Sequence, residues 1–268
     1  MYNSYPELLK AVKEDGETIS SSSVSVNRSF ETRELNNVQV LMKDDNEYIL
    51  NDNEKKYLAV EMDWFMDRVY KHVNPPLELG HDKEAPRNLI DASVITTDNV
   101  NKKLKEMALS LLDGCVNRAG PNSNYGEMCL RLKNHLGITQ LEWVCAKLEK
   151  DPLSRQAVAF YNSPNYQYWS NQDFVCTLNQ LFSIKGDMLN TVVNIRSNDL
   201  INCFRFDSIW YRTFQKIVLA RLQKTYPSLK LGYLLCNIFS AHYYLKDEAK
   251  LEKILDPSTV FERLNYTI

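Results

Sequence analysis

The sequence predicts an α+β protein with a mixed or antiparallel sheet, and three observations support this. Segments with the two-residue periodicity of strands are interspersed with amphipathic helical segments, without the regular alternation of a doubly wound fold. Residues 174–195, FVCTLNQLFSIKGDMLNTVVNI, place two apolar runs around Lys185-Gly186-Asp187, which is typical of an antiparallel hairpin. No linker-like stretch divides the 268 residues convincingly, so we expect a single domain spanning residues 1–268.

The N-terminal part contains helical and extended patterns. Residues 4–14 have Leu8, Leu9 and Val12 on one side of a short helix. SVSVNRS and ELNNVQVLM read as two strands around a polar turn at Arg28 to Arg33. Residues 43–54 are acidic and rich in Asn, as in a loop, and residues 55–72 place Leu58, Met62, Phe65 and Val69 on one helical face.

Pro, Gly and helix-capping residues mark where the remaining helices, strands and loops are expected to begin and end. We expect a loop at 75–96, a helix capped by Asp98 and a loop at 119–126. Thr139 and Glu142 form a capping box at the start of the next helix, which ends at Asp151-Pro152. This helix is expected to bury Leu141, Val144, Cys145 and Leu148. After these come a strand at 157–161, the hairpin strands 174–184 and 188–195, a helix at 208–225, a strand at 231–239 and a helix at 241–254.

Composition excludes several classes of function. The formal net charge is −2, which argues against sequence-independent electrostatic binding to nucleic acid or to an anionic membrane. The N-terminus has no apolar signal region, no apolar run reaches membrane-spanning length, and the six cysteines form no C-x-x-C pair. We therefore expect a cytoplasmic protein with free thiols, five of them small core residues. The four histidines are dispersed, so we expect no metal site.

Residues 171–212 contain several candidate catalytic and ligand-binding residues. They hold Cys176, the pair Arg196-Ser197 one hairpin away, and Asp199 and Asp207. Taken singly, Cys176 reads as a buried strand cysteine, Arg-Ser as a solvated strand end, and Asp207 as the N-cap of the following helix. Together, DFVCT…VVNIRSND, with twenty residues between the cysteine and the arginine, resembles the active-site segment of thymidylate synthases. It is closer still to the deoxycytidylate hydroxymethylases of T-even-type phages.

The resemblance implies a thymidylate synthase-like three-layer fold and roles for several residues. Cys176 is the expected nucleophile, which adds to C6 of a pyrimidine, with its thiolate favoured by nearby guanidinium groups. Arg196 and Ser197 hold the nucleotide phosphate. DPLSRQAVAFY resembles a segment whose arginine, here Arg155, reaches across a homodimer into the other subunit's site, although Gln156 replaces a second arginine. Arg28 matches an N-terminal phosphate-binding arginine.

Asp207 bears on the choice of base. Thymidylate synthases have asparagine there, whose amide can both donate to uracil O4 and accept from N3–H. Cytosine reverses this pattern, and a carboxyl group can accept from its amino group and, when protonated, donate to N3. Asp207 therefore favours cytosine over uracil.

The resemblance assigns the other site residues as well. Glu61, in AVEMDWF, organises water and proton transfers, unless it lies on the solvent face of its helix. Tyr125, in NSNYG, lies beside the nucleophile. His242 and Tyr244, in FSAHYY, contact the nucleotide sugar, and Asp199 binds the pterin of the co-substrate 5,10-methylenetetrahydrofolate.

The hypothesis from the sequence is a folate-dependent enzyme that converts dCMP, a pyrimidine nucleoside monophosphate, into 5-hydroxymethyl-dCMP and supplies modified DNA in a phage-infected or similar cell. The same chemistry on CMP or dUMP, a thymidylate synthase, and a catalytically silent nucleotide-binding homologue stay open as alternatives.

Overall fold

The structure is a computed structural model, and part of the chain can be described. The described residues are 1–23, 28–42, 54, 58, 61, 62, 65, 66, 124–164, 167 and 174–256. Among them, no helix is long and apolar enough to cross a membrane. The loops predicted at 43–54 and 75–96 and the helix capped by Asp98 lie outside these residues, except for Glu54, which is helical.

The described part contains helices and strands in roughly equal measure. The helices are α1 (Tyr5–Asp15), α5 (Gln140–Lys150), α6 (Phe204–Leu222) and α7 (Glu248–Leu255), with a π-helix η2 (Glu127–Arg131) and a 3-10 helix η4 (Leu245–Asp247). The strands are β1 (Glu17–Ser23), β2 (Arg28–Met42), β3 (Val158–Phe160), β4 (Thr177–Lys185), β5 (Met188–Asp199) and β6 (Lys230–Tyr244).

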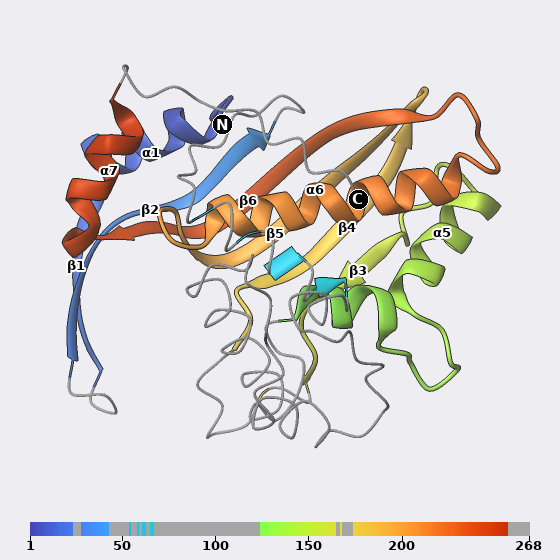
Figure 1. The fold of residues 1–268 in the computed structure, drawn as a ribbon, viewed down its shortest axis with the longest axis horizontal. Helices are drawn as coiled ribbons and strands as arrows, with labels where there is room; N and C mark the ends of the chain where they lie inside the picture. The colour runs from blue at the N-terminus through green and yellow to red at the C-terminus, as the bar shows by residue number, and fades with distance from the viewer. Residues whose placement is uncertain are drawn as a thin grey trace, which may run out of the picture. The chain divides into compact units, whose positions relative to one another are not determined.

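The six strands form one mixed sheet in the order β1-β2-β6-β5-β4-β3 (Figure 1). Neighbouring strands are antiparallel except β5 and β6, which are parallel and are connected through α6. The predicted hairpin is present: Lys185 pairs with Met188 across a turn in which Gly186 has φ 61°, a conformation that glycine adopts without strain. The α+β prediction with a mixed sheet is confirmed.

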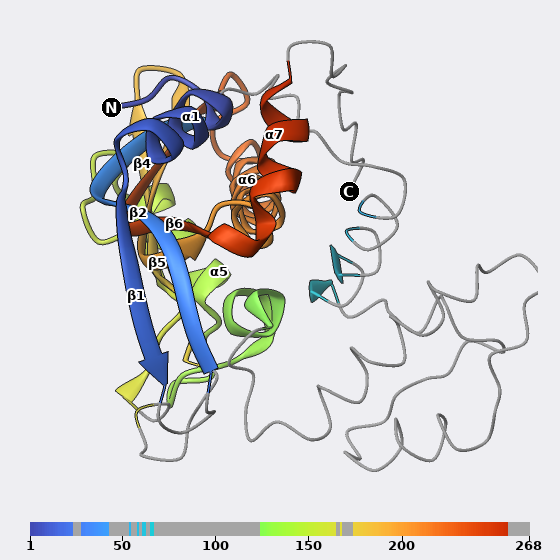
Figure 2. The ribbon, with the colours of Figure 1, turned by 90° about the vertical axis from the view of Figure 1, so that its left-hand side faces the viewer.

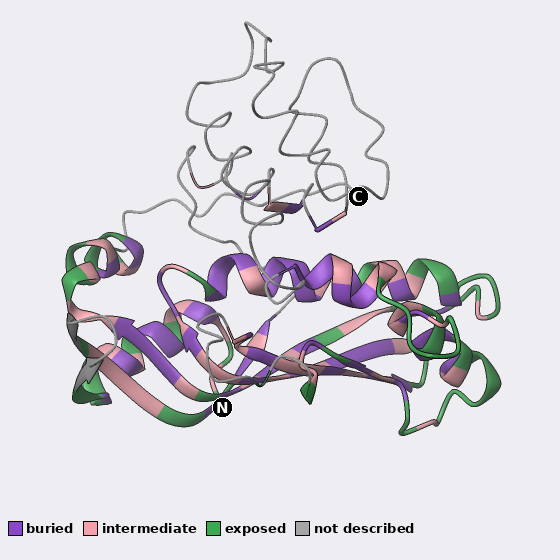
Figure 3. Ribbon diagram, turned by 90° about the horizontal axis from the view of Figure 1, so that it is seen from below, coloured by how far each residue is buried: buried purple, intermediate pink, exposed green. Residues whose placement is uncertain are grey.

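In the described part of the first unit, one face of the sheet is covered by a helix and the other face is open. α6 runs along the covered face and buries large apolar side chains there, including Trp210, Phe214 and Val218 (Figure 3). Along β6, Leu234, Cys236 and Ile238 are buried, whereas the alternate residues Tyr233 and Phe239 are 44% and 60% exposed. Because side chains of a strand alternate between faces, β6 presents its apolar core residues to α6 and Tyr233 and Phe239 to the other side.

α1 and α7 complete the region around the ends of β5 and β6. α1 buries Leu8, Leu9 and Val12, as its sequence predicts, and packs against β2 and α7. The Tyr5 hydroxyl donates to the Leu200 carbonyl at 2.8 Å, so α1 also holds the turn that follows β5. Figure 2 shows α6 and α7 on the same side of the strands.

Two compact units can be distinguished. One consists of residues 1–49, 140–160 and 176–268 and contains the sheet; the other consists of residues 50–139 and 161–175. In the second unit Leu58, Met62 and Phe65 are helical and buried, as the periodicity predicts. The single-domain interpretation stays a prediction.

Three predicted boundaries were wrong in the first unit. Residues 28–33 are not a turn but strand, because each pairs with a residue of Thr18–Ser23 and this backbone pairing outweighs their polar composition. The helix predicted from 208 begins at Phe204, since Asp199 Oδ1 accepts the N–H groups of Ile201 and Asn202 and so forms the turn that precedes it.

The third is β6, which continues to Tyr244 in place of a helix from 241, because residues 240–242 pair with both β2 and β5. Elsewhere, Tyr125 and Gly126 are helical and not part of a loop, and Leu141 is only partly buried. The helix predicted from Thr139 is present as α5, with Val144, Cys145 and Leu148 buried.

Candidate active site

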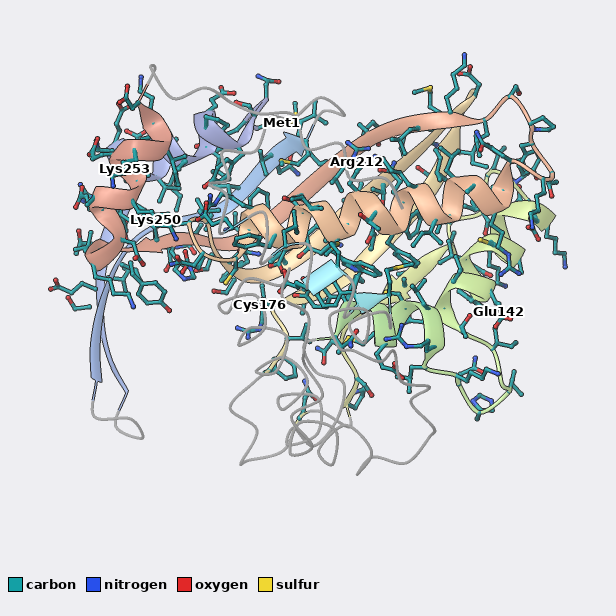
Figure 4. The ribbon with its side chains drawn as sticks, viewed as in Figure 1. Met1, Glu142, Cys176, Arg212, Lys250 and Lys253 are labelled. Carbon is teal, nitrogen blue, oxygen red and sulfur yellow. The ribbon has the colours of Figure 1, made fainter. Side chains whose placement is uncertain are left out.

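The hairpin brings Cys176 and Arg196 together. Cys176 is in the segment that enters β4, one residue before its first residue (Figure 4). The Arg196 N–H donates to the Cys176 carbonyl at 2.9 Å. The twenty-residue spacing in the sequence is therefore the path through one hairpin, and Cys176 is partly exposed at its end.

The other described cysteines separate into two groups. Cys129, Cys145 and Cys236 are buried, as predicted for core residues. Burial raises the pKa of the Cys145 thiol to about 12 and also raises the pKa values of Cys129 and Cys236, so these thiols stay protonated at neutral pH. The prediction is wrong for Cys203, which is exposed in the turn before α6. Cys115 lies outside the described residues.

Arg196 lines an open hollow in the sheet, with a volume of about 410 Å³. Its polar lining comes from three strands and includes Asn37, Gln39, Asn194 and Asn237. Asn237 Nδ2 donates to Asn194 Oδ1 at 2.9 Å, and Asn194 Nδ2 donates to Asn179 Oδ1 at 2.8 Å. This row of amides crosses the open face, so the Arg196 guanidinium has a polar, solvent-accessible setting suited to an anion.

Asp207 lies in the first turn of α6, and not at its N-cap. Its N–H donates to the Cys203 carbonyl at 3.0 Å, so its backbone is already helical. The side chain is partly buried, and Oδ2 accepts a hydrogen bond of 3.0 Å from Nδ2 of Asn198. Burial raises the pKa of Asp207 to about 7, and the bond from Asn198 opposes that rise. Both protonation states of this carboxyl are therefore accessible near neutral pH.

The adjacent strand ends hold Asp199, His242 and Tyr244. Asp199 pairs with His242 in the register of β5 and β6, and Ser197 pairs with Ser240. The rings of His242 and Tyr244 meet edge to face at 5.6 Å. The pKa of Tyr244 is raised, first by burial and then by nearby ionisable acids, in the order Asp199, Cys203, Cys176 and Asp247. The Tyr244 phenol is therefore expected to stay protonated at neutral pH.

Asn202 joins this region to the η4–α7 segment. Its Nδ2 donates to Asp199 Oδ2 at 2.8 Å and to Asp247 Oδ2 at 3.0 Å. Its Oδ1 accepts from Lys250 Nζ at 2.9 Å, and Lys250 is labelled on α7 in Figure 4. Sequence reasoning did not single out Asn202, although the D-x-x-N pattern between a strand and a helix is the local signal for such a turn.

Arg155 and Arg28, the other two arginines expected to bind phosphate, do not belong to the β4–β5 hairpin that holds Arg196. Arg155 is exposed in the segment between α5 and β3. The neighbouring Gln156, which stands where the resemblance has a second arginine, accepts a 2.8 Å hydrogen bond from Lys147 Nζ. Arg28 is the first residue of β2, and its side chain lies outside the described part of the structure.

Glu61 and Tyr125 belong to the second unit. Glu61 is helical and partly buried, between the solvent-facing and buried alternatives. Tyr125 is 6% exposed; its ring stacks on Phe65 at 5.5 Å and meets Tyr161 edge to face at 4.9 Å. Both roles suggested for these residues stay predictions.

Comparisons with known proteins agree with the resemblance in the sequence. The sequence model of the family described as "Thymidylate synthase" matches residues 94–264. The "Deoxycytidylate 5-hydroxymethyltransferase" of Enterobacteria phage T6 is 31% identical over 137 residues, covering 47% of this chain and 54% of that protein. The proteins of the same name from phages T4 and T2 are each 33% identical over 141 residues, with the same coverage.

The chain spans about half the length of these curated relatives. The family match covers most of the chain, including β3 to β6 and every predicted site residue from Tyr125 onward. The chain belongs to the thymidylate synthase family.

Proposed function

We propose that the protein is a deoxycytidylate 5-hydroxymethylase, which transfers a one-carbon unit from 5,10-methylenetetrahydrofolate to C5 of dCMP and adds water to give 5-hydroxymethyl-dCMP. The observation that carries the choice of cytosine is Asp207, a partly buried carboxyl with a pKa of about 7 in the first turn of α6. Such a group can accept from the N4 amino group of cytosine and, when protonated, donate to N3. The curated relatives with this name support the same choice.

Cys176 is the proposed nucleophile. Its thiolate forms a bond between sulfur and C6 of the pyrimidine, and the electrons of the C5–C6 double bond move to C5, which becomes the attacking atom. Of the described cysteines, only Cys176 and Cys203 are not buried, and Cys176 is the one in backbone contact with Arg196. Loss of the C5 proton would then release the folate nitrogen from the transferred carbon and leave an exocyclic methylene on the ring. Addition of water to that methylene would return an electron pair to C5, and expulsion of the sulfur from C6 would restore the C5–C6 double bond and the free thiolate.

Arg196 and Ser197 are proposed to hold the phosphate, and His242 and Tyr244 the sugar. Arg28 is a further proposed phosphate ligand. Glu61 is proposed to position the water that becomes the hydroxyl group and to move protons at C4 and C5, with Tyr125 beside the nucleophile.

Asp199 is the proposed ligand for the folate. Among the described residues, its Oδ2 accepts one hydrogen bond, from Asn202, and a carboxylate oxygen has room for a second donor, so it fits an N–H group of a pterin. When bound, 5,10-methylenetetrahydrofolate supplies the one-carbon unit at the oxidation level of formaldehyde. The role of Asp199 is to orient that molecule toward C5.

We also propose a homodimer that uses the open face of the sheet. This face exposes large aromatic side chains: Phe239 is 60%, Phe160 55% and Tyr233 44% exposed. Exposed apolar patches of this kind mark interfaces. Arg155 is exposed and would be donated to the phosphate of the other subunit. A mixture of Arg155→Ala and Cys176→Ser subunits, each inactive alone, would then regain activity, because one site of the mixed dimer has both residues. Unchanged inactivity after subunit exchange would contradict the donation.

Release of tritium from [5-³H]dCMP tests the activity. We expect folate-dependent release that is lost in Cys176→Ser and retained in Cys203→Ser, the matched change of a second accessible thiol. Mass spectrometry of the product separates a hydroxymethyl group from the methyl group that a thymidylate synthase would give. Parallel reactions with dUMP and CMP test the base and the sugar. Release from none of the three by folded protein would leave a catalytically silent nucleotide-binding homologue.

A further inference from the structure

Asn198 is a buried residue of β5 that the proposed chemistry does not use. Its side chain is 1% exposed, and its Nδ2 donates to Asp207 Oδ2 at 3.0 Å. Its Oδ1 is buried and has no hydrogen-bond partner among the residues that the structure describes. An unpaired buried acceptor costs on the order of 1–3 kcal/mol of stability, so its retention beside a partly buried carboxyl calls for a reason.

The bond from Asn198 makes the two oxygens of Asp207 different. Oδ2 receives an N–H donor, so a proton on Oδ2 would face that donor and is disfavoured. The proton of the neutral acid therefore resides on Oδ1, and the carboxyl has a fixed order of one acceptor and one donor. Without this bond the proton could occupy either oxygen, and the carboxyl could match either base.

This fixed order suits cytosine, in which an N4 amino donor lies next to an N3 acceptor. Uracil has the opposite order, with an O4 acceptor next to an N3–H donor. The unpaired Asn198 Oδ1 adds a second partial negative charge beside Asp207, which favours an amino group there and disfavours a carbonyl oxygen. The Asn198 side chain would therefore both favour the N4 amino group of cytosine and disfavour the O4 carbonyl of uracil.

We propose that Asn198 is a positioning residue that fixes the donor–acceptor order of the Asp207 carboxyl and thereby sets the preference for cytosine over uracil. This inference rests on the proposed function, in that it assumes Asp207 faces the base. Asn198 acts through Asp207 and needs no contact with the nucleotide.

The coupling can be measured first without any nucleotide. In the wild-type protein, the side-chain amide signals of Asn198 in a ¹⁵N NMR spectrum should shift with pH at the midpoint of the Asp207 carboxyl, and this shift should vanish in Asp207→Asn. In Asn198→Ala the pKa of Asp207 should be higher than in the wild type, because the amide bond that lowers it is gone. An Asn198 amide that ignores the titration would overturn the proposal.

Binding of dCMP and dUMP by calorimetry is the second measurement. We expect the ratio of their dissociation constants to move toward dUMP by about tenfold in Asn198→Ala, which is the size expected for loss of one hydrogen bond to a carboxyl group. Asn198→Leu keeps a side chain of similar size but has no donor, and should show the same change if Asn198→Ala does not fold. Asn190→Ala removes another buried asparagine of β5, whose Oδ1 accepts from Tyr233 N at 3.1 Å, and should lower Tm without altering the ratio.

The outcomes separate the inference from the function on which it rests. A wild-type protein that prefers dCMP, with an unchanged ratio in both Asn198 variants, would overturn the role of Asn198 and leave the proposed function intact. A wild-type protein that binds neither nucleotide would overturn the proposed function and with it the specificity role, even where the amide signals follow the carboxyl.

Discussion

Replacing Asp207 by asparagine should stabilise the protein at alkaline pH and have little effect at acidic pH. The carboxyl has a pKa of about 7 in the folded protein because it is removed from water, against 3.8 for the free group. Below both values it is neutral in the folded and unfolded states, and folding is not penalised. Above both values it is charged in both states, and the folded state has the full cost of burying the charge. Stability contributed by this group is thus lost as pH rises from about 4 to 7.

The magnitude follows from the shift. A difference of about 3 pKa units corresponds to about 4 kcal/mol at pH 8, with about 2.5 kcal/mol of that arising between pH 5 and pH 8. Asparagine has nearly the same shape, does not titrate, and still offers an oxygen to Asn198 Nδ2. The variant should therefore gain roughly those amounts relative to the wild type, while every other titrating group contributes equally to both proteins.

Urea denaturation followed by circular dichroism at pH 5, 6, 7 and 8 measures this difference. Asn198→Ala is a useful companion, since it removes the hydrogen bond and keeps the carboxyl, and should show a steeper loss of stability with pH. A difference between Asp207→Asn and the wild type that is independent of pH would refute the reasoning, because it would mean that Asp207 is ionised in the folded protein throughout this range.

Four substitutions give separate tests. Asp207→Asn should lose the rise in Tm caused by dCMP and gain one with dUMP, and an unchanged preference in a thermal shift assay would contradict the specificity assigned to Asp207. Asn202→Ala removes the bonds to Asp199 and Asp247, so KM for the folate should rise while the affinity for dCMP measured by calorimetry stays constant. Gly126→Ala would place a Cβ 1.7 Å from the Phe65 carbonyl oxygen and should cost at least about 2 kcal/mol of stability. Gly186→Ala, with a positive φ but open space around it, should cost less, about 1 kcal/mol by thermal denaturation.

The hairpin and the amphipathic helices could be predicted because their signals are local. The glycine turn between β4 and β5 and the spacing of Leu8, Leu9 and Val12 each depend on residues close together in the chain. The polar strand at 28–33 could not, because its conformation is set by pairing with β1, and its composition is that of a turn. The same applies to His242, which a helical reading places wrongly and which pairs with strands on both sides.

The site was predictable in part for a related reason. The residues of the Cys176–Arg196 segment are joined by one hairpin, so spacing alone brings them together. The contact between Asn198 and Asp207 depends on how the turn after β5 leads into α6, which the sequence suggested would begin four residues later than it does. That error made Asp207 look like a cap and concealed its amide partner.

Polar residues at the end of β5 contact several different parts of the candidate site. Arg196 contributes to the open face of the sheet, Asn198 bonds to the first turn of α6, and Asp199 bonds to the turn that leads into that helix. Because β5 is an interior strand, polar side chains here are costly to bury unless each has a partner or a ligand. Asn198 has a buried oxygen without a partner among the described residues, and it adjoins the Asp207 carboxyl, whose pKa is raised to about 7. Selection of the base is therefore expected to depend on this pair, while Arg196 stays the proposed ligand of the phosphate.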